Sequence, residues 1–123
     1  MQSKAFRFGP VALSNVAANI LNPGTTTGGV NSTASPYGNL RIILTHISIV
    51  DKGGAGGTFS LFIGATGGSA AGTEFMGKTR SVPANGTVDW YGRVPLDVAD
   101  FLTGLASAST TLTIEGEGEI MVA

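Results

Sequence analysis

Glycine and proline are distributed so that no long helix can form in this chain of 123 residues. There are 19 glycines and 5 prolines, and one or the other interrupts almost every window of about a dozen residues. Both residue types destabilise the interior of a helix, and the 3.6-residue repeat of apolar side chains that marks an amphipathic helix is nearly absent. The chain is therefore expected to be all-β.

Several segments have the composition and alternation of strands. Residues 41–50, RIILTHISIV, are rich in β-branched side chains and apolar on both faces, which is typical of a covered central strand. Residues 58–63 alternate, and the glycine-rich turn at 51–57 predicts that these two strands form a hairpin. Further strands are expected at 87–96, 101–106 and 110–122, with weaker ones near 4–8 and 16–21. About seven or eight short strands predict an antiparallel β-sandwich with jelly-roll-like topology.

The length suits a single domain that spans residues 1–123. Residues 22–39 form a long polar stretch without periodicity, and a compact domain seldom has so long a structureless loop unless the loop has a function. Residues 1–10 are expected to form an N-terminal arm. Residues in the arm and the loop that we expect at an interface with a neighbouring chain are Lys4, Phe6, Arg7, Phe8 and Tyr37.

The charge composition excludes several classes of partner. With 7 basic and 8 acidic side chains, the chain has no field to attract nucleic acid or an anionic membrane. Charged residues are only 12% of the chain, which indicates that copies of the chain or a partner cover much of its surface. No segment approaches the ~18 apolar residues of a membrane span, no signal peptide is expected, and the absence of cysteine excludes disulfides and thiolate sites.

The segment GTEFMGKT at residues 72–79 matches the phosphate-binding loop pattern. A working loop of this kind follows a buried strand and opens a helix, whose N-terminus helps to bind the anion. Here Pro83 and Gly86 follow too soon for a helix to continue, and Glu74 would place negative charge near the phosphates. We therefore expect a turn and a short strand, with no nucleotide bound.

Three carboxylates, Glu115, Glu117 and Glu119, lie at alternate positions in TIEGEGEI. In a strand they project from one face, about 6 to 7 Å apart, so they could hold a divalent cation. The favoured interpretation is a solvated stripe that discourages pairing with other sheets, and no metal is expected. His46, the one histidine, is expected to be a packed or interface residue.

The remaining polar and aromatic residues do not make a catalytic constellation. Asp97 and Asp100 fall in a turn, where aspartate is favoured because it bonds to the local backbone. Trp90 and Tyr91 point to opposite faces of their strand, which places Trp90 in the core and leaves Tyr91, with Arg93, to line an exposed contact. The chain is expected to have no catalytic residues, no cofactor and no enzymatic activity.

The order of these segments resembles small jelly-roll virion proteins of tailed bacteriophages. The resemblance covers residues about 40 to 120 and is carried by seven stretches of sequence. They are LTHISIVDK at 44–52, followed by a glycine turn, TFSLFIG at 58–64, VPANGTVDW at 82–90, VPLD at 94–97, DFL at 100–102, ASA at 106–108 and LTIEG at 112–116.

The resemblance implies a structural function. It implies a protein made in the host cytoplasm that binds the major capsid protein on the virion surface as a decoration or cement protein, as a homo-oligomer with a trimer favoured. A tail or baseplate component is the alternative within the same class. A carbohydrate-binding jelly-roll module is the alternative from another class, because a fold does not determine function.

Overall fold

The computed structural model describes residues 2–23, 39–64, 73–97, 100–108 and 111–122. Within these residues the chain forms strands and no helix, and no segment qualifies as a helix able to span a membrane. The strands are β1 (Gln2–Ala12), β2 (Ala18–Leu21), β3 (Asn39–Asp51), β4 (Gly57–Gly64), β5 (Glu74–Val82), β6 (Thr87–Asp97), β7 (Phe101–Ala106) and β8 (Leu112–Val122).

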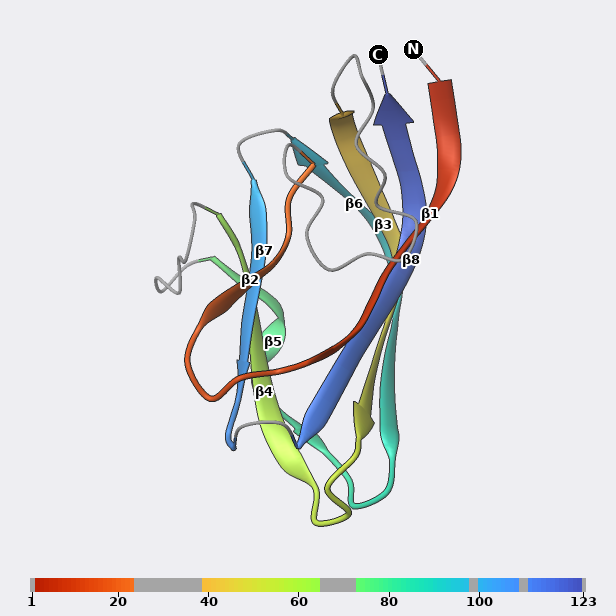
Figure 1. Ribbon diagram of the computed structural model, residues 1–123. Coiled ribbons are helices and arrows are strands. Elements are labelled where there is room, and N and C mark those ends of the chain that lie inside the picture. The colour runs from red at the N-terminus through yellow and green to blue at the C-terminus, as the bar shows by residue number, and fades with distance from the viewer. Residues whose placement is uncertain (1, 24–38, 65–72, 98–99, 109–110, 123) are drawn as a thin grey trace.

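The strands form two antiparallel sheets that face one another across a shared core (Figure 1). One sheet has the order β1-β8-β3-β6, and the other has the order β2-β7-β4-β5. The core draws apolar side chains from both sheets, as expected of a sandwich. The all-β class and the antiparallel sandwich architecture are thereby confirmed.

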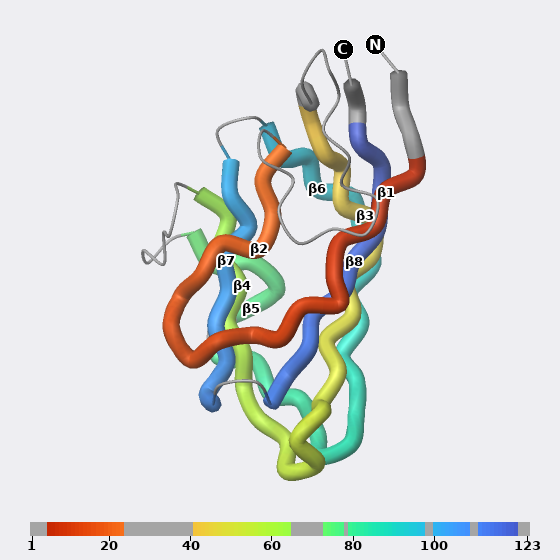
Figure 2. The backbone as a smooth tube through the Cα atoms, in the orientation of Figure 1, coloured from red at the N-terminus to blue at the C-terminus, as the bar shows by residue number. Residues whose placement is uncertain are grey.

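The expected hairpin between residues 41–50 and 58–63 is wrong. Both edges of β3 are already paired, one with β6 and the other with β8, so no edge is left for β4. The chain instead crosses to the second sheet after β3, where β4 pairs with β5 and β7. Figure 2 shows this crossing as the yellow-green loop at one end of the molecule.

The carboxylate of Asp51 organises the crossing from β3 to β4. Its Oδ1 accepts hydrogen bonds from the backbone N–H groups of Gly53 and Gly54 at 3.0 and 3.2 Å, and its Oδ2 accepts from Gly56 at 2.8 Å. Oδ2 also accepts a hydrogen bond at 2.8 Å from the N–H of Asn85. Asn85 lies in the turn between β5 and β6. One side chain therefore joins two connections between the sheets.

These hydrogen bonds stabilise the ionised form of Asp51. The bond from Asn85, followed by that from Gly56, lowers the pKa of Asp51 below its ordinary value of 3.8. A carboxyl whose folded pKa is lowered stabilises the fold fully above the unfolded pKa, and this contribution is lost as the pH falls through the folded pKa.

We predict that Asp51→Asn lowers the midpoint of thermal unfolding at pH 7, because a neutral amide accepts these bonds more weakly than a carboxylate. The difference in unfolding midpoint between the wild type and the variant should become smaller as the pH falls below about 4. Scanning calorimetry from pH 7 to pH 3 measures both effects. A difference that stays constant over this range would contradict the assignment.

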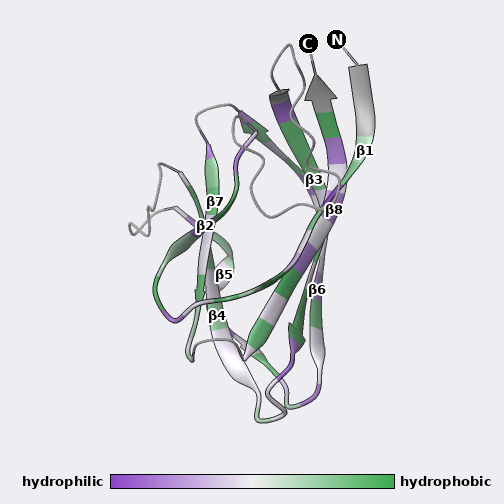
Figure 3. Cartoon of the chain, viewed as in Figure 1, coloured by the Kyte–Doolittle hydropathy of each residue, from purple (hydrophilic) through white to green (hydrophobic). Residues whose placement is uncertain are grey.

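Two aromatic residues of β1 lie opposite glycines of β8, and one of their rings packs directly over its glycine. In the β1–β8 register Phe6 lies opposite Gly118, and Phe8 lies opposite Gly116. Both rings are buried, and a Cβ on Gly116 would collide with the Phe8 ring. Gly116 therefore leaves space for the Phe8 ring on the inner face, and Figure 3 shows bands of differing hydropathy along β8.

This packing corrects the expectation of an N-terminal arm at residues 1–10. Residues 2–12 are a paired strand of the sheet, and Phe6 and Phe8 are core residues rather than interface residues. Sequence reasoning missed the pairing because the small inner-face positions that receive the rings lie more than a hundred residues away. Of the expected loop at 22–39, residues 24–38, with Tyr37, lie outside the described residues.

We predict that Phe8→Ala destabilises the fold by about 3–5 kcal/mol, as expected when a fully buried ring is removed. Val16→Ala is the matched control, since Val16 is an exposed apolar residue in the same part of the chain; it should change stability by less than about 0.5 kcal/mol. Urea unfolding followed by tryptophan fluorescence measures both. Equal effects of the two substitutions would mean that Phe8 does not contribute to the core.

The phosphate-loop pattern at 72–79 lies largely in β5, and no helix follows it. Met76, Gly77 and Thr79 have positive φ angles of 65°, 93° and 52°, and the register with β4 shifts in this region. Ser60 Oγ accepts a hydrogen bond from the Thr79 N–H at 3.0 Å, within the irregular part of the strand. The expectation that this segment lacks the helix of a phosphate-binding loop is confirmed.

Candidate functional site

A row of polar and aromatic side chains crosses the outer face of the β1-β8-β3-β6 sheet. The register places Arg7 of β1 opposite Glu117 of β8, Glu117 opposite His46 of β3, and His46 opposite Tyr91 of β6. Directly opposed residues in antiparallel strands share a face, so the row brings together residues from all four strands. Its members are separated by up to 110 positions in the chain, from residue 7 to residue 117.

His46 lies at the centre of this row and bonds to carboxylates on both sides. Its Nδ1 lies 2.8 Å from Oε1 of Glu117, and its Nε2 lies 2.9 Å from Oδ1 of Asp89 on β6. The Tyr91 ring stacks on the imidazole, with centroids 4.5 Å apart and planes inclined by 16°. The stacked ring and the two hydrogen bonds together hold the imidazole in one orientation.

The two carboxylates favour the charged form of the imidazole. The hydrogen bond to Asp89 is the largest cause and Glu117 adds to it; together they outweigh partial burial, and the pKa of His46 is raised above 6.5. In the imidazolium both nitrogens donate hydrogen bonds. Because the pKa of His46 is higher in the folded chain, its hydrogen bonds to the two carboxylates stabilise the fold. This stabilisation is fully present below pH 6.5 and is lost as the pH rises through the folded pKa.

We predict that the His46 ring titrates above pH 6.5 and that Asp89→Asn lowers this pKa, because the amide removes the charge that stabilises the imidazolium. The chemical shift of the ring Cε1–H, followed by NMR against pH, gives both values directly. Asp97→Asn is the control, since Asp97 bonds to Arg41 rather than to His46. A pKa at or below 6.5 in the wild type would contradict the geometry.

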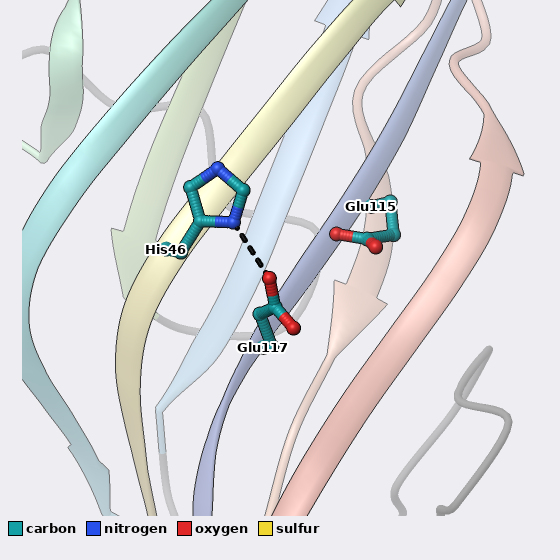
Figure 4. A group of neighbouring side chains, drawn as sticks. All are labelled: His46, Glu115 and Glu117. Carbon is teal, nitrogen blue, oxygen red and sulfur yellow. Dashed lines mark hydrogen bonds and ion pairs between the residues drawn. The ribbon is translucent and has the colours of Figure 1, made fainter.

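Glu115 brings a second carboxylate of β8 to the same place. Figure 4 shows its carboxylate extending toward the His46 ring, and ligand atoms of His46, Glu115 and Glu117 all lie within 4.8 Å of one another. Oε1 of Glu115 is buried and has no hydrogen-bond partner among the residues that the structure describes. We refer to His46, Glu115 and Glu117 as the histidine–carboxylate cluster.

An open groove borders the cluster. Its volume is about 510 Å³, and Tyr91 at its margin is 74% exposed. The groove therefore combines an exposed aromatic ring with a carboxylate. The lining residues are Ala5, Phe6, Thr45, His46, Tyr91, Glu117 and Gly118.

The sequence correctly predicted the direction of several of these side chains. Glu115, Glu117 and Glu119 lie at alternate positions of β8, on the face opposite the core residues Ile114 and Ile120. Trp90 packs against the core, with its ring 5.1 Å from that of Phe75 in a T-shaped contact, while Tyr91 is exposed.

The meeting of His46 with Glu115 and Glu117 was not predicted. It depends on pairing between β3 and β8 and on an irregularity in the register between Leu44 and His46. No local pattern in the sequence marks that irregularity. The alternation of polar residues along each strand was the available signal. It predicts on which face of the sheet a side chain lies, but it does not predict which residue lies beside it on the adjacent strand.

The other expected site residues are dispersed. Arg93 is exposed on β6, and Lys4 lies in β1 opposite Ile120. Asp97 and Asp100 bond within their turn, where the Asp97 N–H donates to Oδ2 of Asp100 at 2.9 Å, as expected for turn residues. Arg7 belongs to the outer-face row, where its Nε is buried and no described residue forms a hydrogen bond with it.

Comparison with protein-family models and with curated proteins finds no match to this chain.

Proposed function

We propose that the two sheets form a jelly roll. In such a fold an antiparallel ribbon pairs the first strand with the last and continues inward, and successive pairs alternate between two sheets. The strand order supports this topology, because β1–β8 and β3–β6 lie in one sheet while β2–β7 and β4–β5 lie in the other. Viral capsid domains and lectins are among the proteins that use this architecture.

We propose on this basis that the protein is a structural component of a virion that binds the major capsid protein as a decoration or cement protein. The strand order is the observation that carries the proposal. The low content of charged residues supports it, since a surface covered by partners needs less charge to stay soluble. Binding of many copies to a repetitive shell would multiply a modest contact area into firm attachment.

The outer face of the β1-β8-β3-β6 sheet is the proposed docking surface. Tyr91 is exposed there and belongs to a residue type that is enriched at protein interfaces. Arg93 lies two positions further along the same strand and is also exposed. Docking through this face does not require Phe6 and Phe8, which remain in the core.

Quantitative mass spectrometry of particles purified from cells that carry the gene tests this function. A copy number comparable to that of the major capsid protein is expected for a decoration protein. A small fixed number would instead assign the chain to the tail or baseplate. Absence from the particles would refute the virion function.

We predict that Arg93→Glu lowers the number of copies on the particle, because it reverses a charge on the proposed docking surface. Arg80→Glu is the matched control, since Arg80 is an exposed arginine on β5 of the other sheet. Both variants should remain folded by circular dichroism. Equal loss of occupancy in the two variants, or no loss in either, would place the docking surface elsewhere.

A carbohydrate-binding module is the second candidate, favoured by the groove beside Tyr91. Sugar rings stack on exposed aromatic faces while their hydroxyls bond to nearby carboxylates, and here Glu117 lines the same groove as Tyr91. A glycan array with wild type and Tyr91→Ala separates the alternatives. Binding that the substitution abolishes supports the module, and no binding by the wild type removes it.

A further inference from the structure

The histidine–carboxylate cluster combines one imidazole and two carboxylates, the donor types that bind divalent transition metals. Its donor atoms lie within 4.8 Å of one another. We propose that His46, Glu115 and Glu117 form a binding site for a divalent cation such as Zn²⁺, with Nδ1 of His46 and one carboxylate oxygen from each glutamate as ligands.

Asp89 and Tyr91 hold the imidazole ring in an orientation that suits a metal ligand. Asp89 lies 2.9 Å from Nε2, so a ring that binds a metal through Nδ1 can keep its Nε2 proton bonded to this carboxylate. A carboxylate behind a ligating histidine is the usual outer partner in metal sites, where it sets the tautomer and the ring orientation. The stacked Tyr91 ring prevents the imidazole from turning away.

Nδ1 faces the two glutamates. It lies 2.8 Å from Oε1 of Glu117, and Glu115 approaches from the same strand (Figure 4). A metal with ligand bonds of about 2.0–2.2 Å needs donor atoms separated by roughly 3.0–3.5 Å. The donor atoms now lie within 4.8 Å of one another, so binding requires side-chain rotations that bring them closer together.

The cation would take the place of the hydrogen bond between His46 and Glu117. That bond joins Nδ1 to Oε1 of Glu117 at 2.8 Å, and a metal ligand must present a lone pair at Nδ1 instead. Local charge favours the exchange, because Glu115, Glu117 and Asp89 surround a single imidazole. Arg7 on the neighbouring strand belongs to the same row. Its single positive charge is smaller than the combined negative charge of the three carboxylates.

Glu115 gives an independent reason to expect a cation. Its Oε1 is buried and lacks a hydrogen-bond partner within the described part of the chain, although a buried carboxylate oxygen is costly unless it is paired. Glu117, by contrast, is half exposed and already bonds to His46. A metal between them would satisfy the oxygen that the protein leaves unpaired.

The donor set distinguishes among metals. Imidazole suits Zn²⁺, Cu²⁺, Fe²⁺ and Ni²⁺, whereas Mg²⁺ and Ca²⁺ prefer sites made only of oxygen. Three protein ligands also leave at least one coordination position for water or for a donor from another molecule. The site is therefore expected to select Zn²⁺ over Mg²⁺.

Isothermal titration calorimetry with ZnCl₂ and with MgCl₂ on the purified full chain tests the proposal. The wild type should bind one Zn²⁺ and no Mg²⁺. His46→Gln and Glu115→Gln should each weaken Zn²⁺ binding by at least about tenfold, and Asp89→Asn, which removes only the outer partner, by about tenfold. Glu119→Gln is the matched control on the same strand and face, and it should bind as the wild type does.

A second measurement separates this site from nonspecific surface binding. The NMR signal of the His46 ring should shift with one equivalent of Zn²⁺ in the wild type and in Glu119→Gln, and should not shift in Glu115→Gln. Circular dichroism checks that each variant is folded. No Zn²⁺ binding by the wild type, or equal losses in Glu119→Gln and Glu115→Gln, would overturn the proposal whether or not the chain is found on particles.

Discussion

The packing of the Phe8 ring over Gly116, with Phe6 opposite Gly118, is the contact on which the rest of the first sheet depends. It joins the two ends of the chain as neighbouring strands, and it does so through residues that are small on one strand and large on the other. Glycine in a strand interior is unfavourable by itself, but an aromatic ring that covers it from the opposite strand restores the lost contact. The inner faces of β1 and β8 therefore specify one another.

The same alternation determines the outer face. Because Gly116 must face the Phe8 ring, Glu115, Glu117 and Glu119 must face outward, and a slip of one residue would reverse both sets. Pairing of β3 on the other side of β8 then brings His46 beside Glu117. The outer-face row is thus a consequence of the core packing, and it forms only when strands from both ends of the chain have assembled.

How far the sequence predicts this structure depends on whether a property is local. Strand positions such as Arg41–Val50, and the opposite directions of Trp90 and Tyr91, follow from local alternation and were predicted. The pairing partners of each strand were not predicted, because a glycine-rich segment such as residues 51–57 suits both a hairpin turn and a crossing to the other sheet. In the structure the crossing is held by a hydrogen bond between Asp51 and Asn85, and no local sequence pattern connects these two residues.

The position of the histidine–carboxylate cluster links any ligand it binds to the stability of the sheet. His46 lies on β3 and both glutamates lie on β8, and these are the two central strands of their sheet. A cation held between them binds only the folded chain and therefore stabilises it by an amount that grows with its concentration relative to the dissociation constant. Since the cluster opens onto the proposed docking surface beside Tyr91, a donor from a partner that filled the remaining coordination position would make docking and folding stability depend on the same ion.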